Sequence, residues 1–163
     1  MQITEHIYAT HIEEDPSSFG AMHPGGTHIY FVGDPKDHMV MVDSGEPYRA
    51  WTKQIVDFHA ELGKPRISAI LITHGHGDHI GDSVAIAKMN GAKIVLNADM
   101  GRTFATNGWT GMKQLVRINK SGPVKPIGDG ITITMVRAEH SSEVVYKDSG
   151  GKMSMEPGGE PAG

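Results

Sequence analysis

The feature that most constrains this chain is a near-continuous apolar run over residues 67–73 that leads directly into a histidine-rich segment. Apolar residues at successive positions are typical of a strand that is covered on both faces, whereas a half-exposed strand alternates. The pattern that follows predicts a helix over 78–90, with Gly91 as its C-terminal cap. Another β-branched segment, 93–97, predicts the next strand. This order of elements predicts an α/β fold.

The flanking segments agree with that fold class. Residues 27–33 and 38–43 are rich in β-branched and aromatic residues and are separated by turn residues, which predicts a β-hairpin. Residues 47–62 carry an apolar stripe at helical spacing. A short helix is expected near 98–105, and the alternation of 131–136 predicts a further strand.

Composition excludes several classes of function. The chain has no cysteine, which excludes disulfide frameworks, cysteine-ligated zinc, iron–sulfur clusters and thiol nucleophiles. A formal net charge of −4 disfavours nucleic acid as a partner. Neither a basic, apolar targeting segment nor an apolar run long enough to span a bilayer is visible, so no membrane association and a cytoplasmic location are expected.

The chemistry is concentrated between the apolar run and the helix after it. Three imidazoles and one carboxylate lie within six residues there: His74, His76, Asp78 and His79. These side chains are good ligands for Zn²⁺ and similar cations. Residues two apart in an extended turn point to the same side, and the intervening glycines permit a sharp backbone path. The pattern favours a metal site, with a solvated polar turn as the alternative.

This arrangement, His74-x-His76-x-Asp78-His79, resembles the HxHxDH signature of the metallo-β-lactamase-fold hydrolases. Residues 27–32 followed by 41–45 resemble that family's early hairpin and the Asp–Thr/Ser–Gly turn beneath its metal site. The segment 133–142 resembles the later strand that ends in a ligand histidine, and is nearest to a branch of general metal-dependent hydrolases. The resemblance runs along nearly all of the chain and implies a metallo-β-lactamase-like αββα sandwich.

The resemblance also implies a role for each site residue. His74, His76 and His140 would bind a first metal ion, while Asp78 and His79 would bind a second. Asp78 would in addition orient the nucleophile, which makes it the candidate catalytic residue. Asp43 would orient the histidine-rich loop by hydrogen bonds, with an ordinary Asp–Ser–Gly turn as the alternative. For His140 the alternative is a surface histidine at the end of a strand.

Two ligands of the family pattern have no counterpart here. A bridging aspartate and a final histidine would follow His140, yet the acidic residues after it are Glu143, Asp148, Glu156 and Glu160, and there is no further histidine. We therefore expect residues 1–147 to be the N-terminal portion of a single domain that lacks its C-terminal half. Residues 148–163 are expected to be a Gly/Pro-rich flexible tail or a truncated loop.

The implied function is a metal-dependent hydrolase. It would use a metal-bound hydroxide on an ester, lactone, thioester, amide or phosphodiester. Zinc is the expected metal, as one or two ions, with iron or manganese as alternatives. The expected partner is a small-molecule substrate, and His23 is a candidate contact for it. A homo-oligomer or a complementing C-terminal segment is left open. The alternative function is a truncated, non-catalytic metal-binding fragment of such a hydrolase.

Overall fold

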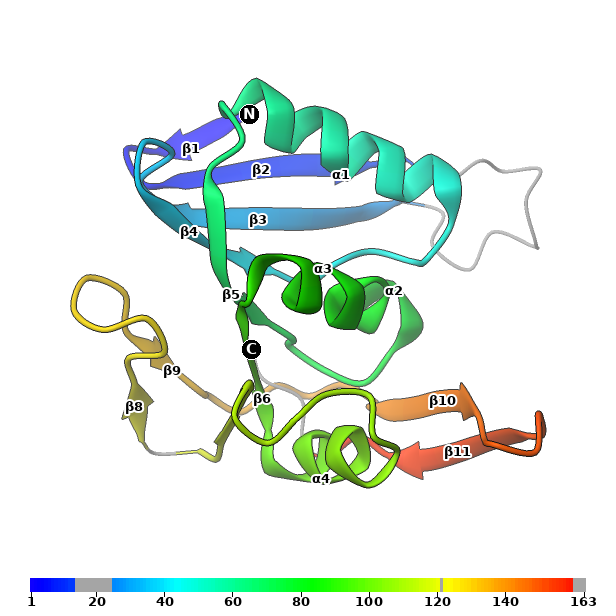
Figure 1. Cartoon of the computed structure of the whole chain (residues 1–163). Coiled ribbons are helices and arrows are strands. Elements are labelled where there is room, and N and C mark those ends of the chain that lie inside the picture. Colours follow the sequence, from blue (N-terminus) through cyan, green and yellow to red (C-terminus); the bar gives the residue numbers. More distant parts are fainter. Residues whose placement is uncertain (14–24, 121, 160–163) are drawn as a thin grey trace.

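The computed structural model describes residues 1–13, 25–120 and 122–159 (Figure 1). Seven strands form one sheet in chain order: β1 (Gln2–Thr4), β2 (Ile7–Ile12), β3 (Thr27–Gly33), β4 (His38–Val42), β5 (Arg66–Leu71), β6 (Lys93–Asn97) and β7 (Leu115–Ile118). The first four strands pair antiparallel, and β4 to β7 pair parallel. The predicted hairpin is thus confirmed as β3 and β4.

The helices cover one face of this sheet. They are α1 (Arg49–Glu61), α2 (Gly77–Ile80), α3 (Ser83–Asn90) and α4 (Ala98–Thr106). In Figure 1, α1, α3 and α4 lie in front of the strands. Trp51 of α1 and Phe104 of α4 pack into the same buried cluster as Ile70 of β5. Burying each such side chain contributes about 1.5–3 kcal/mol, so this layer accounts for much of the core.

The opposite face of the sheet is also apolar, which explains the near-continuous apolar run over 67–73. Successive residues there alternate between the two layers: Ile70 faces the helices, and Leu71 packs with Val95 on the other side. That second cluster is covered by the segment with the short strands β8 (Pro123–Val124) and β9 (Ile133–Thr134). The prediction of a strand buried on both faces is therefore confirmed.

Two predicted elements differ from the structure. The helix expected over 78–90 is broken into α2 and α3 at Gly81, whose φ is 29°. A Cβ on Gly81 would lie 1.7 Å from the carbonyl oxygen of Gly45, so the two backbones meet where only glycine fits. The strand expected over 131–136 is reduced to Ile133–Thr134.

The C-terminal segment also differs from its expectation. Within the predicted flexible tail 148–163, Met153–Pro157 form β11, which pairs antiparallel with β10 (Glu143–Lys147). The hydroxyl of Tyr146 in β10 donates to Oε1 of Glu156 at 2.7 Å and joins the two strands of the hairpin. The hydroxyl of Thr103 donates to Oε2 of Glu156 at 2.9 Å and fastens the hairpin to α4. Composition hid the strand because its inward-facing residues, Ser154 and Glu156, are polar. Residues 160–163 lie outside the described part of the chain.

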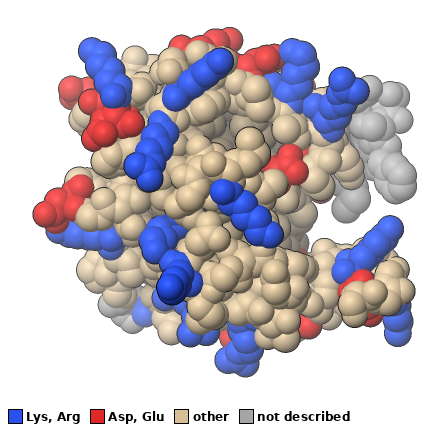
Figure 2. All heavy atoms as spheres, viewed as in Figure 1, with Lys and Arg blue, Asp and Glu red and all other residues tan. Residues whose placement is uncertain are grey.

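In Figure 2, Lys and Arg side chains lie over the middle and the lower part of the molecular face, and Asp and Glu side chains lie mainly toward its rim. Across the described ranges, no helix is both long and apolar enough to cross a membrane.

Candidate metal centre

Three histidines from two distant parts of the chain come together at one edge of the sheet. His74 and His76 lie in the loop that follows β5, and His140 lies in the segment that precedes β10. One ring nitrogen from each lies within 4.8 Å of the others. The Nε2 atom of His74 is 3.2 Å from the Nδ1 atom of His76. The ring centroid of His140 is 4.6 Å from that of His74. The structure thus places all three predicted ligands of the first metal around one point.

The separation of the nitrogens of His74 and His76 matches that of two ligands on one metal ion. Two nitrogen ligands bound to Zn²⁺ at tetrahedral angles lie about 3.3 Å from each other, given the usual zinc–nitrogen bond length. The 3.2 Å separation between His74 and His76 agrees with that value. His74 is buried, His76 is half-buried and His140 is exposed, so the group lies at the surface with one side open.

A chain of hydrogen bonds sets the orientation of His74. The Oγ1 atom of Thr73 lies 2.9 Å from Oδ2 of Asp43 and 3.1 Å from Nδ1 of His74. Because a carboxylate only accepts, the hydroxyl donates to Asp43 and accepts from the imidazole N–H. The Nε2 atom of His74 therefore carries the free lone pair. Burial, and then the neighbouring histidines, lower the pKa of His74 to about 3, so this ring is neutral at physiological pH.

The second predicted pair, Asp78 and His79, lies beside the first group. The rings of His74 and His79 have centroids 3.9 Å apart. Nδ1 of His79 lies 2.8 Å from Oδ2 of Asp43, and its Nε2 lies 3.0 Å from Oδ2 of Asp78. Burial alone would lower the pKa of His79, but the hydrogen bonds to Asp43 and Asp78 outweigh it and raise the pKa to about 9. A metal ion bound at Asp78 and His79 would take the place of that Nε2 proton.

The end of β4 holds the histidine-rich loop in place. The backbone N–H of Thr73 donates to Oδ1 of Asp43 at 2.9 Å. The backbone N–H of Ser44 donates to the carbonyl of His79 at 3.0 Å, and its hydroxyl donates to the carbonyl of Ile80 at 2.6 Å. These bonds favour the orienting role for Asp43 over an ordinary turn.

Sequence reasoning missed several side chains around the histidines. The hydroxyl oxygen of Thr73 lies within hydrogen-bond distance of Asp43 and His74, and Oγ of Ser141 lies 3.2 Å from Nε2 of His76. The hydroxyl oxygen of Ser142 accepts from the backbone N–H of Gly75 at 3.0 Å, and Oε2 of Glu143 lies 3.2 Å from Nε2 of His76. The sequence signal that could have identified them is position: Thr73 directly precedes His74, and Ser141, Ser142 and Glu143 directly follow His140. The other candidate contact, His23, lies outside the described residues.

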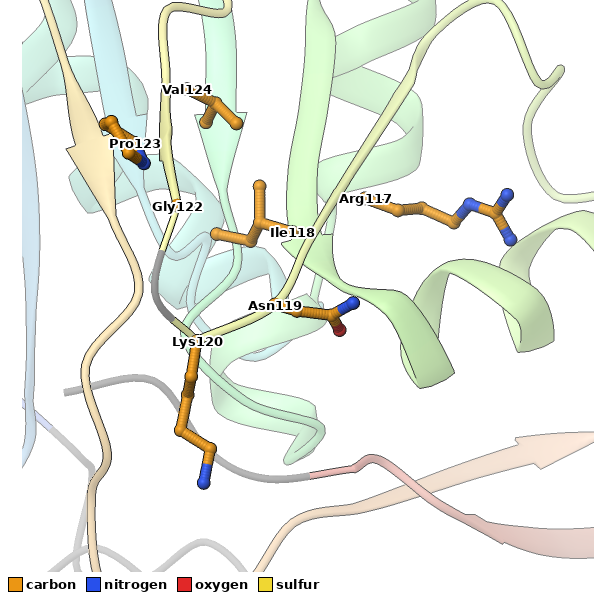
Figure 3. A pocket seen from close by; sticks show the side chains of 7 residues that line it. All are labelled: Arg117, Ile118, Asn119, Lys120, Gly122, Pro123 and Val124. Atoms are coloured by element: carbon orange, nitrogen blue, oxygen red, sulfur yellow. The ribbon is translucent and has the colours of Figure 1, made fainter.

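A hollow of about 220 Å³ lies against the same loop. Its lining includes Gly75, Gly77, Ile80, Trp109 and Val144, with one carboxylate from Glu46. A different hollow of about 320 Å³ lies after β7 and is drawn in Figure 3. There the side chains of Arg117 and Lys120 point in different directions, so they do not converge on a shared ligand. None of the five predicted site residues lines that second hollow.

Comparisons with known proteins agree with this arrangement. The sequence profile described as the Metallo-beta-lactamase superfamily matches residues 22–142. A UPF0173 metal-dependent hydrolase of Polaromonas sp. (strain JS666) is 43% identical over 103 residues, covering 63% of this chain and 37% of the relative. A UPF0173 metal-dependent hydrolase of Cupriavidus metallidurans is 34% identical over 157 residues, covering 91% of this chain and 53% of the relative. The chain thus spans between about a third and a half of the length of these curated relatives.

Solved structures share the fold. A subclass B3 metallo-beta-lactamase of Bradyrhizobium japonicum superposes with a TM-score of 0.53 at 24% identity, covering 80% of this chain and 55% of that protein. A flavo di-iron protein mutant from Thermotoga maritima superposes with a TM-score of 0.56 at 20% identity, covering 73% of this chain and 30% of that protein. The α/β architecture is therefore that of the metallo-β-lactamase fold. Because the sequence profile matches most of the length of this chain, the chain belongs to the metallo-beta-lactamase superfamily.

Proposed function

We propose that this chain carries the metal-binding part of a zinc-dependent hydrolase. His74, His76 and His140 hold the first metal ion, and Asp78 with His79 contributes to a second. The observation that carries the proposal is the 3.2 Å approach of Nε2 of His74 to Nδ1 of His76.

The donor set supports a cation at this point. The Thr73 hydroxyl accepts a hydrogen bond from the N–H of His74, and the Glu143 carboxylate accepts one from the N–H of His76. The lone pairs of Nε2 of His74 and Nδ1 of His76 then face each other. Two lone pairs at that distance repel unless a proton or a metal ion lies between them. The low pKa of His74 disfavours a proton carried by that ring. Neutral imidazoles without thiolates suit Zn²⁺, and also Fe²⁺ or Mn²⁺ where carboxylates join them.

A bound divalent ion would supply Lewis acidity, which activates water and polarises a carbonyl or phosphoryl oxygen. The chain's own groups prepare the place for that chemistry. Hydrogen bonds keep the ring nitrogens of His74 and His76 oriented, and Asp43 holds His79. The buried carboxylate of Asp78 is the group that orients the attacking water. The substrate class that fits is a small molecule with an ester, lactone, thioester, amide or phosphodiester bond.

A second candidate is metal binding without turnover. Within the described ranges, the group of three or more clustered ligands is His74, His76 and His140, and Asp78 with His79 offers the second ion two side chains. Two-metal hydrolysis places an ion on each side of the reacting bond, so a weakly held second ion would give binding with little hydrolysis.

Metal content and hydrolysis measured together separate the two candidates. The chain is loaded with Zn²⁺, desalted and assayed for bound zinc by mass spectrometry. It is then assayed for hydrolysis of p-nitrophenyl acetate and bis-p-nitrophenyl phosphate. His76→Ala is the test variant, and His6→Ala, which alters an exposed histidine far from the site in sequence, is its control. Zinc and hydrolysis that are lost only in His76→Ala support the enzyme. Zinc without hydrolysis supports the binding fragment, and wild-type protein without zinc overturns both.

A further inference from the structure

We propose that Glu143 is a positioning residue for the metal ligand His76. Its carboxylate fixes which ring nitrogen of His76 carries the hydrogen and which one faces the metal. This inference rests on the proposed function, because it assigns Glu143 a role toward the same first metal ion.

The geometry separates the two nitrogens of His76. Nδ1 faces Nε2 of His74 at 3.2 Å, and Nε2 faces Oε2 of Glu143 at 3.2 Å. An ionised carboxylate only accepts hydrogen bonds, so Nε2 of His76 must donate to it. That assignment leaves Nδ1 as the lone-pair donor on the side where His74 and His140 converge.

The same contact argues against Glu143 as a direct ligand of the first ion. A carboxylate that shared this ion would lie on the Nδ1 side of His76, next to Nε2 of His74. It lies instead on the Nε2 side, where Ser141 Oγ is also 3.2 Å away. Glu143 therefore acts on the metal through His76.

The backbone holds Glu143 in this place even though 45% of its side chain is exposed. The backbone N–H of Gly75 donates to the hydroxyl of Ser142 at 3.0 Å. A Cβ on Gly75 would lie 3.0 Å from the carbonyl oxygen of Glu143, so the histidine-rich loop and the start of β10 are in close contact. This contact also places His140, three residues before Glu143, beside the other two histidines.

His74, His79 and His76 each have a ring nitrogen within hydrogen-bond distance of a side-chain oxygen. His74 is held through Thr73 by Asp43, His79 is held by Asp43 directly, and His76 is held by Glu143. Histidine ligands of metals commonly donate their second N–H to a carboxylate, and loss of that partner lowers metal affinity by about 10–100-fold. The loss expected from removal of Glu143 lies in that range.

The test compares Glu143→Ala, Glu143→Gln and Glu139→Ala in the full chain. Zn²⁺ affinity is measured by competition with a chromophoric chelator. The imidazole N–H of His76 is followed in the zinc-loaded protein by ¹⁵N-histidine NMR. We expect about 10–100-fold weaker zinc binding and a fast-exchanging His76 N–H in Glu143→Ala. Glu143→Gln keeps an accepting oxygen and is expected to restore most of both. Glu139, which pairs with Arg137 and has an 81% exposed side chain, is the matched control.

Several outcomes would overturn the inference. Glu143→Ala that binds zinc like the wild type and keeps the His76 N–H signal would do so. So would Glu143→Gln that binds as weakly as Glu143→Ala, since a direct ligand or a purely electrostatic role would then fit better. If Glu143→Ala fails to fold, the test rests on the zinc affinity and the His76 N–H signal of Glu143→Gln. Wild-type protein that binds no zinc overturns the proposed function as well. Zinc binding that is lost in His76→Ala but kept in Glu143→Ala overturns this inference alone.

Discussion

Nδ1 of His79 lies 2.8 Å from Oδ2 of Asp43, the residue at the end of β4 whose other carboxylate oxygen accepts the backbone N–H of Thr73. One buried carboxylate therefore holds both the entry to the histidine-rich loop and a predicted ligand within it. Asp43 has a φ of 60°, a left-handed conformation that aspartate and asparagine adopt more readily than most residues. Asparagine can therefore replace Asp43 and remove the carboxylate charge while the left-handed backbone conformation stays favourable.

Asp43→Asn is expected to destabilise the protein and weaken metal binding at His79. The amide nitrogen would donate to Nδ1 of His79, which forces the hydrogen onto Nε2 and removes the lone pair that a metal needs. Loss of hydrogen bonds to a charged, buried group costs about 1.5–3 kcal/mol. Urea unfolding and zinc titration measure the two effects. A variant with unchanged stability and zinc stoichiometry would contradict the role of Asp43.

The contribution of His74 and His79 to the stability of the metal-free protein is expected to be largest near pH 6.5. The pKa of His79 is raised to about 9, so the folded state binds its proton more tightly, and stability falls as pH rises from about 6.5 through 9. The pKa of His74 is lowered to about 3, so the unfolded state binds more protons, and stability falls as pH decreases from about 6.5 toward 3.

Chemical unfolding at a series of pH values checks both slopes. His79→Gln should flatten only the loss of stability on the alkaline side, and His74→Gln only the loss on the acid side. The same proton on His79 competes with a metal ion, so occupancy of a site at Asp78 and His79 should increase with pH up to about 9. An occupancy that does not vary with pH would argue against a metal at this pair.

Gly81→Ala is expected to be strongly destabilising. A Cβ would lie 1.7 Å from the carbonyl oxygen of Gly45, and the position has a positive φ, so helix α2, which carries Asp78 and His79, would have to move. Backbone strain alone costs about 1–3 kcal/mol, before the clash is counted. Gly91→Ala is the matched control, because Gly91 also has a positive φ but has open space around it. Thermal unfolding that shows equal losses in both variants would contradict the close contact at Gly81.

Tyr146→Phe is expected to loosen the β10–β11 hairpin without affecting the metal centre. It removes the hydroxyl that donates to Glu156 at 2.7 Å. Amide hydrogen exchange should become faster in β11, while zinc affinity stays unchanged. Tyr48→Phe, at an exposed tyrosine, is the control. Unchanged exchange in β11 would show that the hairpin is held by other contacts.

Periodicity and local chemistry predicted the parts of the fold that depend on burial. The apolar run over 67–73 and the stripe that contains Trp51 and Ile55 became β5 and α1 because their side chains fill the core. The break at Gly81 could not be predicted in this way, since it depends on Gly45, 36 positions earlier in the sequence. Strand β11 was missed for a related reason, because its contacts with α4 are polar and distant in sequence.

The candidate site followed the same division. His74, His76, Asp78 and His79 could be grouped from the sequence because they lie within six residues. The convergence of His140 was expected only through a family resemblance. The hydrogen bond between Thr73 and Asp43, and the contact between His76 and Glu143, depend on tertiary packing, and no spacing in the sequence encodes them.

The position of His140 has a consequence for the energetics of folding. A metal ion that is bound by both His76 and His140 would cross-link two segments that are far apart in the chain. Such a link removes loop-closure entropy from the unfolded ensemble, so part of the binding free energy appears as resistance to unfolding. The segment between them, with β6, α4 and β7, would lie inside the closed loop. A bound metal ion would then stabilise the fold around β6 and β7 in addition to its chemical role.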